Sequence, residues 1–149
     1  MGNDDDPRIR EVRERFERSE LHARWLALRL DETVPGEVAV SLEVEPRHLN
    51  LMGTLHGGLI ATLADTATGL ALRTRLDLDA SFATTQLSVT FLAPGRQGRI
   101  TARGRVVKAG RRFGYAEADV VDEEGTLLAR ATATFSISPG TTSPEDGSQ

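Results

Sequence analysis

Residues 50–73 read NLMGTLHGGLIATLADTATGLALR and form the least polar stretch of the chain. Small and aliphatic residues fill this stretch, which predicts one apolar helix after the His-Gly-Gly step at residues 56–58. A helix without a broad polar face belongs inside a domain, where other elements cover it. The same stretch nevertheless carries one carboxylate, Asp65, and a buried acid needs a reason to be there.

Composition limits the kind of protein this is. The chain has 149 residues, of which 39% are hydrophobic and 27% charged, so we expect one globular domain. A formal net charge of −4 without a basic block argues against nucleic acid as a partner. The absence of cysteine excludes disulfides, a thiolate nucleophile and cysteine metal sites. No stretch resembles a secretory signal or a membrane span, so we expect a cytoplasmic protein without a membrane partner.

The domain is expected to occupy residues 7–138. Residues 1–6 and 139–149 have the composition of linkers and are expected to be disordered. Pro7 is placed to begin a helix, in which Ile9, Val12 and Phe16 form a narrow apolar stripe suited to packing against a body.

Strand patterns flank the apolar helix on both sides. A first strand around residues 24–33 turns at Pro35-Gly36 into residues 38–44, where Val38, Val40, Leu42 and Val44 alternate with mostly polar residues. Four further segments of strand length follow the helix between residues 81 and 138, joined by short links. Short links predict an antiparallel meander. The expected fold class is α+β, with the sheet curled around the helix and its free edges covered by a second copy of the chain in a dimer.

The start of the apolar helix offers a site for negative charge. After His56, the two glycines Gly57 and Gly58 leave the first backbone N–H groups without internal partners and without shielding side chains. The helix dipole adds partial positive charge there, which suits an oxyanion or a polarised carbonyl. The alternative is a tight turn that lets the helix pack closely.

Asp65 lies on a narrow polar stripe with Thr62, Thr66 and Gly69. Such an acid is a candidate general base or nucleophile, and the alternative is a carboxylate that faces water at a dimer groove or caps a neighbouring element. Asp65 follows Gly57 by about 12 Å along the helix axis, so the two groups of one chain cannot act on one carbonyl. If both are catalytic, two helices must run antiparallel across a dimer.

The pattern of Asn50, Gly53, the His56–Gly58 step and Asp65 resembles the signature of hotdog-fold acyl-CoA thioesterases. The resemblance is to the PaaI-type, phenylacetate-degradation-like branch of the 4-hydroxybenzoyl-CoA thioesterase superfamily. It extends over residues 20–138 and includes the segments SVTFLAPG and VVKAGRRF. The resemblance implies a hotdog fold, in which a sheet of five to six strands wraps one long helix, and an assembly as a dimer or a dimer of dimers.

The family resemblance also implies roles for particular residues. Asp65 would activate water or attack the thioester carbon, and the Gly57 N–H would stabilise the oxyanion. Asn50 would orient water or the thioester. His56 would bond near the carbonyl or, alternatively, only cap the helix. Thr84 would lie near the water, unless it is an ordinary strand threonine.

The coenzyme A half of such a substrate carries phosphates. Lys108, Arg111 and Arg112 surround an expected turn at Ala109-Gly110, and we expect them to bind these phosphates, although a solvated turn is the alternative. His22 and His48 have no metal-ligand spacing with His56 or with an acidic pair, so we expect neither a metal nor a separate cofactor.

The favoured function is hydrolysis of an aryl- or medium- to long-chain acyl-CoA. A hotdog dehydratase acting on hydroxyacyl thioesters is one alternative, but it needs an acid and a base across two carbons, usually a paired His and acid. A non-catalytic acyl-CoA-binding module is another, but such modules tend to lack the acid or to carry an added domain. The position of Asp65 well after His56 favours hydrolysis.

Overall fold

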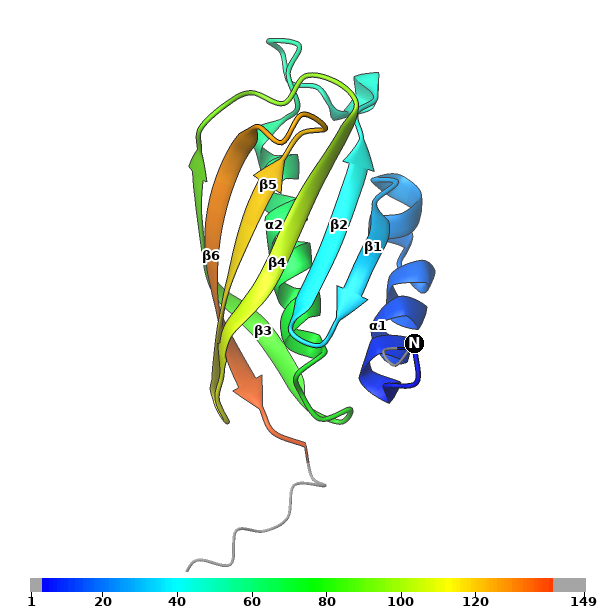
Figure 1. The fold of residues 1–149 in the computed structure, drawn as a ribbon, viewed down its shortest axis with the longest axis vertical. Helices are drawn as coiled ribbons and strands as arrows, with labels where there is room; N and C mark the ends of the chain where they lie inside the picture. The colour runs from blue at the N-terminus through cyan, green and yellow to red at the C-terminus, as the bar shows by residue number, and fades with distance from the viewer. Residues whose placement is uncertain (1–3, 141–149) are drawn as a thin grey trace, which may run out of the picture.

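The computed structural model describes residues 4–140, and the segments 1–3 and 141–149 of the expected disordered ends lie outside it. Ten elements follow one another (Figure 1): α1 (Pro7–Arg18), the π-helical turn η1 (Glu20–Trp25), β1 (Arg29–Val34), β2 (Glu37–Glu43), the 3₁₀ turn η2 (Pro46–His48), α2 (Gly57–Arg73), β3 (Ser81–Phe91), β4 (Arg99–Ala109), β5 (Phe113–Val121) and β6 (Leu127–Ser138). In this part of the chain no helix is long and apolar enough to cross a membrane.

One antiparallel sheet of six strands curves around α2, in the order β1-β2-β4-β5-β6-β3 (Figure 1). The helix lies in the hollow of the sheet, and its buried side packs on aliphatic residues of β2, β4, β5 and β6. A helix of this composition is stable only when it is covered in this way. The expected α+β hotdog arrangement of one long helix, a short N-terminal helix and a curved sheet is therefore confirmed.

The expected meander holds only for β4, β5 and β6. Strand β3 pairs with β6 and not with its successor β4, which pairs instead with β2. The connection 92–98 begins beside β6, since the N–H groups of Leu92 and Ala93 both donate to the carbonyl of Leu128. It then passes the loop before α2, where Leu55 N–H donates to the carbonyl of Gly95. The connection 92–98 is long enough to cross the end of the curved sheet. Strand β3 therefore pairs with β6, whereas β4 lies between β2 and β5.

The first two strands also differ from their expected patterns. The strand expected over residues 24–33 begins only at Arg29, because η1 occupies Glu20–Trp25. Strand β2 is buried on both faces and not on one, with Ala39 at 5% and Ser41 at 0% exposure. Both side chains are small and lie in register beside longer ones, Ser41 opposite Arg29 and Ala39 opposite Arg103.

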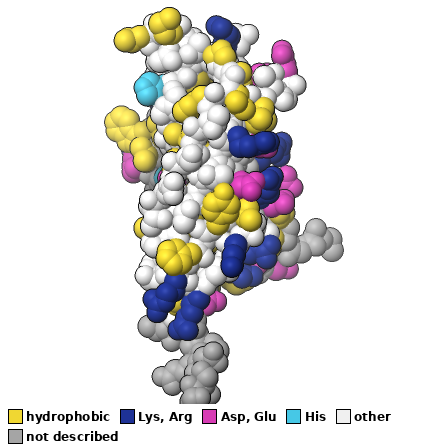
Figure 2. All heavy atoms as spheres, turned by 90° about the vertical axis from the view of Figure 1, so that its left-hand side faces the viewer, with side chains coloured by type: hydrophobic (Ala, Val, Ile, Leu, Met, Phe, Trp, Pro, Cys, Tyr) yellow, Lys and Arg dark blue, Asp and Glu magenta, His cyan; other side chains and the backbone are white. Residues whose placement is uncertain are grey.

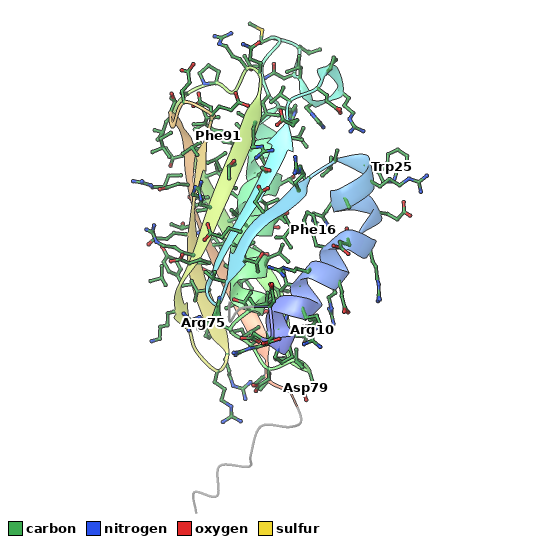
Figure 3. The ribbon with its side chains drawn as sticks, turned by 45° about the vertical axis from the view of Figure 1, so that its right-hand side comes forward. Arg10, Phe16, Trp25, Arg75, Asp79 and Phe91 are labelled. Carbon is green, nitrogen blue, oxygen red and sulfur yellow. The ribbon has the colours of Figure 1, made fainter. Side chains whose placement is uncertain are left out.

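Helix α1 packs through the stripe expected from the sequence. Ile9, Val12 and Phe16 are its buried residues, and Figure 3 shows Phe16 directed toward the body while Trp25 of η1 points away from it. The helix begins after Asp6, whose carboxylate accepts the N–H of Arg8 at 2.9 Å. Asp6 belongs to the segment 1–6 with linker composition, and here it is an N-cap of the kind that stabilises helix starts.

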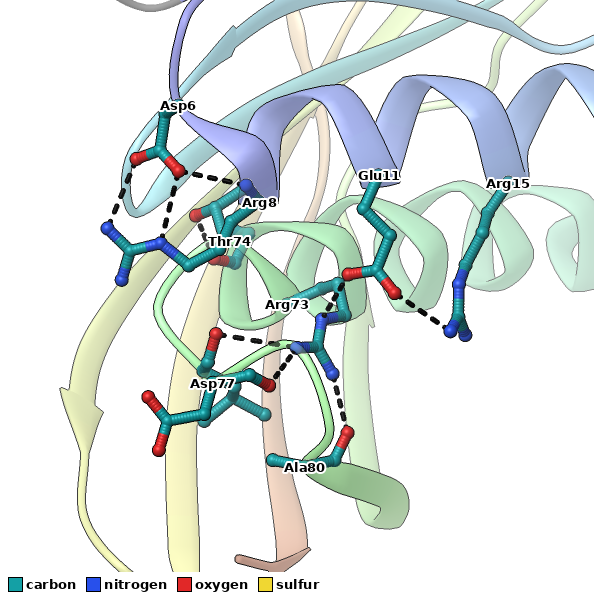
Figure 4. A network of polar contacts seen from close by, with 10 residues as sticks. Asp6, Arg8, Glu11, Arg15, Arg73, Thr74, Asp77 and Ala80 are labelled. Atoms are coloured by element: carbon teal, nitrogen blue, oxygen red, sulfur yellow. Dashed lines mark hydrogen bonds and ion pairs between the residues drawn. The ribbon is translucent and has the colours of Figure 1, made fainter. Parts of the chain in front are cut away.

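A buried arginine ties α1 to the end of α2 (Figure 4). Arg73 is 4% exposed, and its Nε lies 3.3 Å from a carboxylate oxygen of Glu11 on α1. Its guanidinium also donates to the carbonyls of Ala80, at 2.7 Å, and of Asp77. Burial lowers the pKa of Arg73 and Glu11 opposes this, but arginine stays charged in proteins, so the buried charge depends on these partners.

The contact between α2 and the sheet is closest at Gly104 on β4. A Cβ atom at this position would lie 2.8 Å from the backbone nitrogen of Thr68 and would also meet the carbonyl of Ala67. Only glycine allows the two backbones to approach this closely. The middle of α2, just after Asp65, therefore lies directly on the sheet.

Candidate active site

Asp65 and Thr84 meet in the structure. The side chain of Asp65 leaves the middle of α2 on its half-buried side, and the hydroxyl of Thr84 on β3 donates to its Oδ1 at 2.9 Å. The second carboxylate oxygen has no partner of this kind within residues 4–140 and is available to a water or a substrate. The acid thus has a fixed orientation and a free oxygen, as a general base requires.

A cleft of about 360 Å³ opens beside this pair, between α1, η1, α2 and β3. Its wall is mixed and combines aromatic and aliphatic side chains with polar and charged ones. The lining residues are Arg15, Phe16, Ser19, His22, Asp65, Thr66, Gly69, Leu70, Phe82 and Thr84. Thr66 and Gly69, two small residues of the polar stripe on α2, form the floor of the cleft. The stripe predicted from the sequence therefore leaves room for a ligand.

His22 lines this cleft and was not among the candidate residues. Its Nδ1 lies 2.7 Å from the hydroxyl of Ser19, and its ring centroid is 6.0 Å from that of Phe16. Burial lowers the pKa of the His22 imidazole, and the nearby Asp65 carboxylate acts in the opposite direction. The sequence signal was slight, a Ser19 three residues before the histidine that caps a short helical turn.

The start of α2 has the features expected of an anion site. His56 is the N-cap, and its Nδ1 accepts the N–H of Gly58 at 2.9 Å. The carbonyl of His56 accepts the N–H of Leu59. Gly57 N–H, the first of the helix, has no acceptor among the described residues 4–140. His56 therefore serves as a cap through Nδ1, while the Gly57 N–H is left for another partner.

The Asn50 side chain is engaged by its own loop. Its Oδ1 accepts the N–H groups of Met52, at 2.9 Å, and of Thr54, at 3.1 Å. Gly53 closes the loop with φ of 78°, which favours glycine. Asn50 thus shapes the loop that precedes His56, and its contact with water or a thioester stays a prediction.

The candidate residues form two groups on one chain. Asp65 and Thr84 lie at mid-helix, and His56 and Gly57 lie at the helix start with Asn50 nearby in sequence. Eight helical residues separate Gly57 from Asp65, which is about 12 Å along the axis. One chain therefore does not bring the N–H and the acid to one carbonyl.

The predicted phosphate-binding residues lie at the tip of the β4–β5 hairpin. Strand β4 ends at Ala109 and β5 begins at Phe113, so the turn is at residues 110–112 and not at Ala109-Gly110. Arg111 and Arg112 occupy this turn and, with Lys108, border a second cleft of about 280 Å³ that also contains Phe113 and Tyr115. Figure 2 shows Lys and Arg side chains gathered at the lower end of the face, where this hairpin lies.

Known proteins are similar to this chain in sequence and in architecture. The family model of the thioesterase superfamily matches residues 52–129. Human acyl-coenzyme A thioesterase 13 is 32% identical over 107 residues, which cover 70% of this chain and 76% of the human protein. The chain belongs to the thioesterase superfamily.

Solved structures place this thioesterase among hotdog proteins. A thioesterase family protein from Silicibacter pomeroyi is 29% identical with a TM-score of 0.83, covering 89% of this chain and 99% of that one. A mutant of phenylacetic acid degradation protein PaaI from Thermus thermophilus is 35% identical with a TM-score of 0.70, covering 76% and 96%. The predictions of a PaaI-type hotdog fold and of a thioester hydrolase are confirmed.

Proposed function

We propose that this thioesterase hydrolyses acyl-CoA esters to the free acid and coenzyme A, with Asp65 as general base or nucleophile. The observation that carries the proposal is the Asp65–Thr84 hydrogen bond at the edge of a cleft with both polar and apolar walls. A carboxylate held by one oxygen and open at the other can take a proton from water or attack carbon itself. Human acyl-coenzyme A thioesterase 13, by its name, acts on the same kind of ester.

The reaction follows from these groups. Asp65 takes a proton from water while the hydroxide adds to the thioester carbon. The oxyanion that forms is stabilised by the Gly57 N–H at the start of α2, where the helix dipole is positive. The intermediate then expels the thiolate, and the proton held by Asp65 passes to sulfur. Water and the thioester supply all atoms, so the proposed reaction needs no metal or added cofactor.

The site is completed across a dimer. Because Gly57 and Asp65 are about 12 Å apart on one helix, the N–H must come from the α2 of a second copy that runs antiparallel to the first. Two features support this assembly. Strand β3 is an edge of the sheet, and its last residue Phe91 is 54% exposed. The start of α2, at Gly58, is exposed as well. A dimer of dimers is an extension of the same proposal.

The two clefts suit the two halves of the substrate. The cleft beside Asp65 is bounded by Phe16, Leu70 and Phe82, which suit an aryl or a medium- to long-chain acyl group. Arg111 and Arg112 at the hairpin present guanidinium groups suited to the coenzyme A phosphates. The acyl-cleft floor at Gly69 has room, since a Cβ there would contact ring carbons of Phe82 and Phe135 only at 3.7 and 3.8 Å.

The test is a panel of aryl, medium-chain and long-chain acyl-CoA esters, with thiol release as the readout and wild type compared with Asp65→Asn. We expect turnover of at least one class and a loss of roughly 10²- to 10⁴-fold in kcat in the variant, with an unchanged circular dichroism spectrum. Near-normal turnover by Asp65→Asn would reject the assigned role.

The same panel separates the alternatives. Tight binding without thiol release indicates a binding module. Dehydration of a 3-hydroxyacyl-CoA, seen as enoyl absorbance without release of thiol, indicates a dehydratase. Single turnover in ¹⁸O-labelled water tests direct attack by Asp65. Direct attack expels the thiolate and forms an anhydride between Asp65 and the acyl group, and water that opens this anhydride at the Asp65 carbonyl leaves the label in the protein carboxyl group. General-base catalysis places the label in the product acid alone.

A further inference from the structure

A histidine faces the proposed base from the N-terminal segment. His22 lies in η1, a single π-helical turn closed by the Leu26 N–H donating to the carbonyl of Leu21 at 3.0 Å. Isolated π turns are uncommon and occur often at functional sites. This turn sends the imidazole into the same cleft that Asp65 lines from α2.

The course of α1 explains how residues far apart in sequence meet there. Glu11 contacts Arg73 at the end of α2, Phe16 lines the cleft with Gly69, and His22 lines it with Asp65. Helix α1 and η1 therefore run antiparallel to α2 over the open side of its stripe. Their far end, at His22, reaches the turn of α2 that carries the acid.

The imidazole is held in a defined orientation. The Ser19 hydroxyl oxygen accepts the backbone N–H of His22 at 3.2 Å and lies 2.7 Å from Nδ1. The hydroxyl hydrogen is then free to donate to Nδ1, and in the neutral ring this leaves the proton on Nε2. Phe16 packs beside the ring at a centroid distance of 6.0 Å. The ring thus has little freedom to turn away from the cleft.

We infer that His22 is a positioning residue for Asp65: the neutral imidazole leaves the carboxylate free to act in the orientation that Thr84 gives it, and the imidazolium pairs with the carboxylate and withdraws it from the reaction. The inference rests on the proposed function. It adds a residue from the N-terminal segment that controls the pH range in which the base is available.

The charges around His22 support this inference. Within residues 4–140, the charged side chains that line the cleft with His22 are Arg15 of α1 and Asp65 of α2, and β3 contributes the uncharged Phe82 and Thr84. Arg15 is paired with Glu11 at 2.8 Å, so Asp65 is the unpaired charge facing the ring. Burial keeps the pKa of His22 below its usual range, so the neutral form prevails at neutral pH, and Asp65 favours the charged form.

The first test is a pH profile of kcat for wild type, His22→Gln and the control Leu21→Gln. Leu21 lies on the same turn, is 54% exposed and does not line the cleft. Leu21→Gln therefore introduces the same side chain as His22→Gln at a position outside the cleft. We expect wild-type kcat to fall about tenfold per pH unit below the His22 midpoint. The fall should move at least one unit lower in His22→Gln and stay in place in Leu21→Gln. An unmoved acid limb in His22→Gln, with kcat or KM altered equally at all pH values, overturns the inference.

The second test needs no activity and no folded His22 variant. The chain has three histidines, whose imidazole protons can be titrated by NMR in wild type and in Asp65→Asn. We expect one midpoint below the usual value of about 6.5 that falls further in Asp65→Asn, because the charge that favours the imidazolium is gone. A midpoint that ignores Asp65→Asn overturns the inference. If wild type hydrolyses no ester, the proposed function fails, and this titration alone decides whether the two residues are coupled.

Discussion

The Thr84 hydroxyl on β3 donates to Asp65 Oδ1 on α2 at 2.9 Å, joining the sheet edge to the middle of the long helix. A hydrogen bond to a charged group contributes about 1.5–3 kcal/mol, and here it orients the proposed base. We expect Thr84→Val to lower kcat by about tenfold with a smaller change in KM. Thr85→Val is the matched control, because Thr85 donates to the carbonyl of Thr134 instead. Equal losses in both variants would contradict an orienting role for Thr84.

Sharing of the site between two chains is tested by mixing two inactive variants. Asp65→Asn lacks the acid, and Gly57→Pro lacks the first N–H of α2 while keeping a residue that suits a helix start. Unfolding the two together and refolding them should place one intact site in each mixed dimer. With random pairing this restores about a quarter of wild-type activity. Activity that stays at the level of the separate variants, despite mixed dimers seen by mass spectrometry, would exclude the shared site.

The hairpin arginines are tested through the substrate. In Arg111→Ala/Arg112→Ala we expect KM for acyl-CoA to rise by roughly ten- to a hundredfold, since each charge-assisted bond to phosphate is strong but solvent-exposed. The same acyl group on N-acetylcysteamine, which has no phosphate, serves as the control and should be hydrolysed with nearly unchanged KM. The effect on acyl-CoA should shrink as salt is added. Equal rises for both esters would remove the phosphate assignment.

Arg73 gives a prediction about stability. Arg73→Met removes the buried partner of Glu11, which then keeps only its more exposed partner Arg15. It also frees the three backbone carbonyls that accept from Arg73, those of Leu76, Asp77 and Ala80. We expect a loss of about 3 kcal/mol and a Tm lower by roughly 6–12 °C. Arg15→Met is the control, because its ion pair with the same Glu11 is 70% exposed on the arginine side and should contribute under about 1 kcal/mol. Thermal melts of both variants at neutral pH decide the comparison.

The pH dependence of folding follows from His22. Burial holds the pKa of His22 in the folded protein below that of an unfolded chain, and Asp65 only partly offsets this. The unfolded chain therefore binds the proton first as the pH falls. Stability is full above the ordinary histidine value of about 6.5 and declines below it, down to the folded midpoint. Urea melts at pH 7.5 and 5.5 should show a smaller decline in His22→Gln than in wild type, and an identical decline would contradict this account.

Local periodicity predicted the elements that depend on one face being buried. The stripe of Ile9, Val12 and Phe16 and the apolar helix from Gly57 both appear as expected. Apolar residues that recur every three to four positions over several turns indicate a helix and not a strand. Strand pairing was predicted less well. The partner of β3 depends on how the sheet closes around α2, and no residue in the connection 92–98 encodes that choice locally.

The residues of the candidate site also divide into those that stand out in the sequence and those whose position depends on the tertiary fold. Asp65 and the His56–Gly58 step stand out in the sequence because an acid and a glycine pair are unusual in an apolar helix. His22 does not stand out, since its proposed role depends on lining one cleft with Asp65, 43 residues later in the sequence, through the antiparallel course of α1. The π-helical turn that directs the His22 side chain leaves no helix-like or strand-like repeat of apolar residues in the sequence. For Asn50 the structure adds a loop organised by its amide oxygen, and the role in chemistry that the sequence suggested stays a prediction.

Because of Gly104, the position of α2 on the sheet and the shape of the cleft depend on different residues. The backbones of α2 and β4 are in contact at Gly104, so the position of the helix depends on the absence of a side chain there. Thr66, Gly69 and Leu70 line the cleft together with residues of α1, whereas the α2 atoms nearest to Gly104 belong to Ala67 and Thr68. Substitutions at these three positions are therefore expected to change the shape of the cleft while the proposed base keeps its place on the sheet.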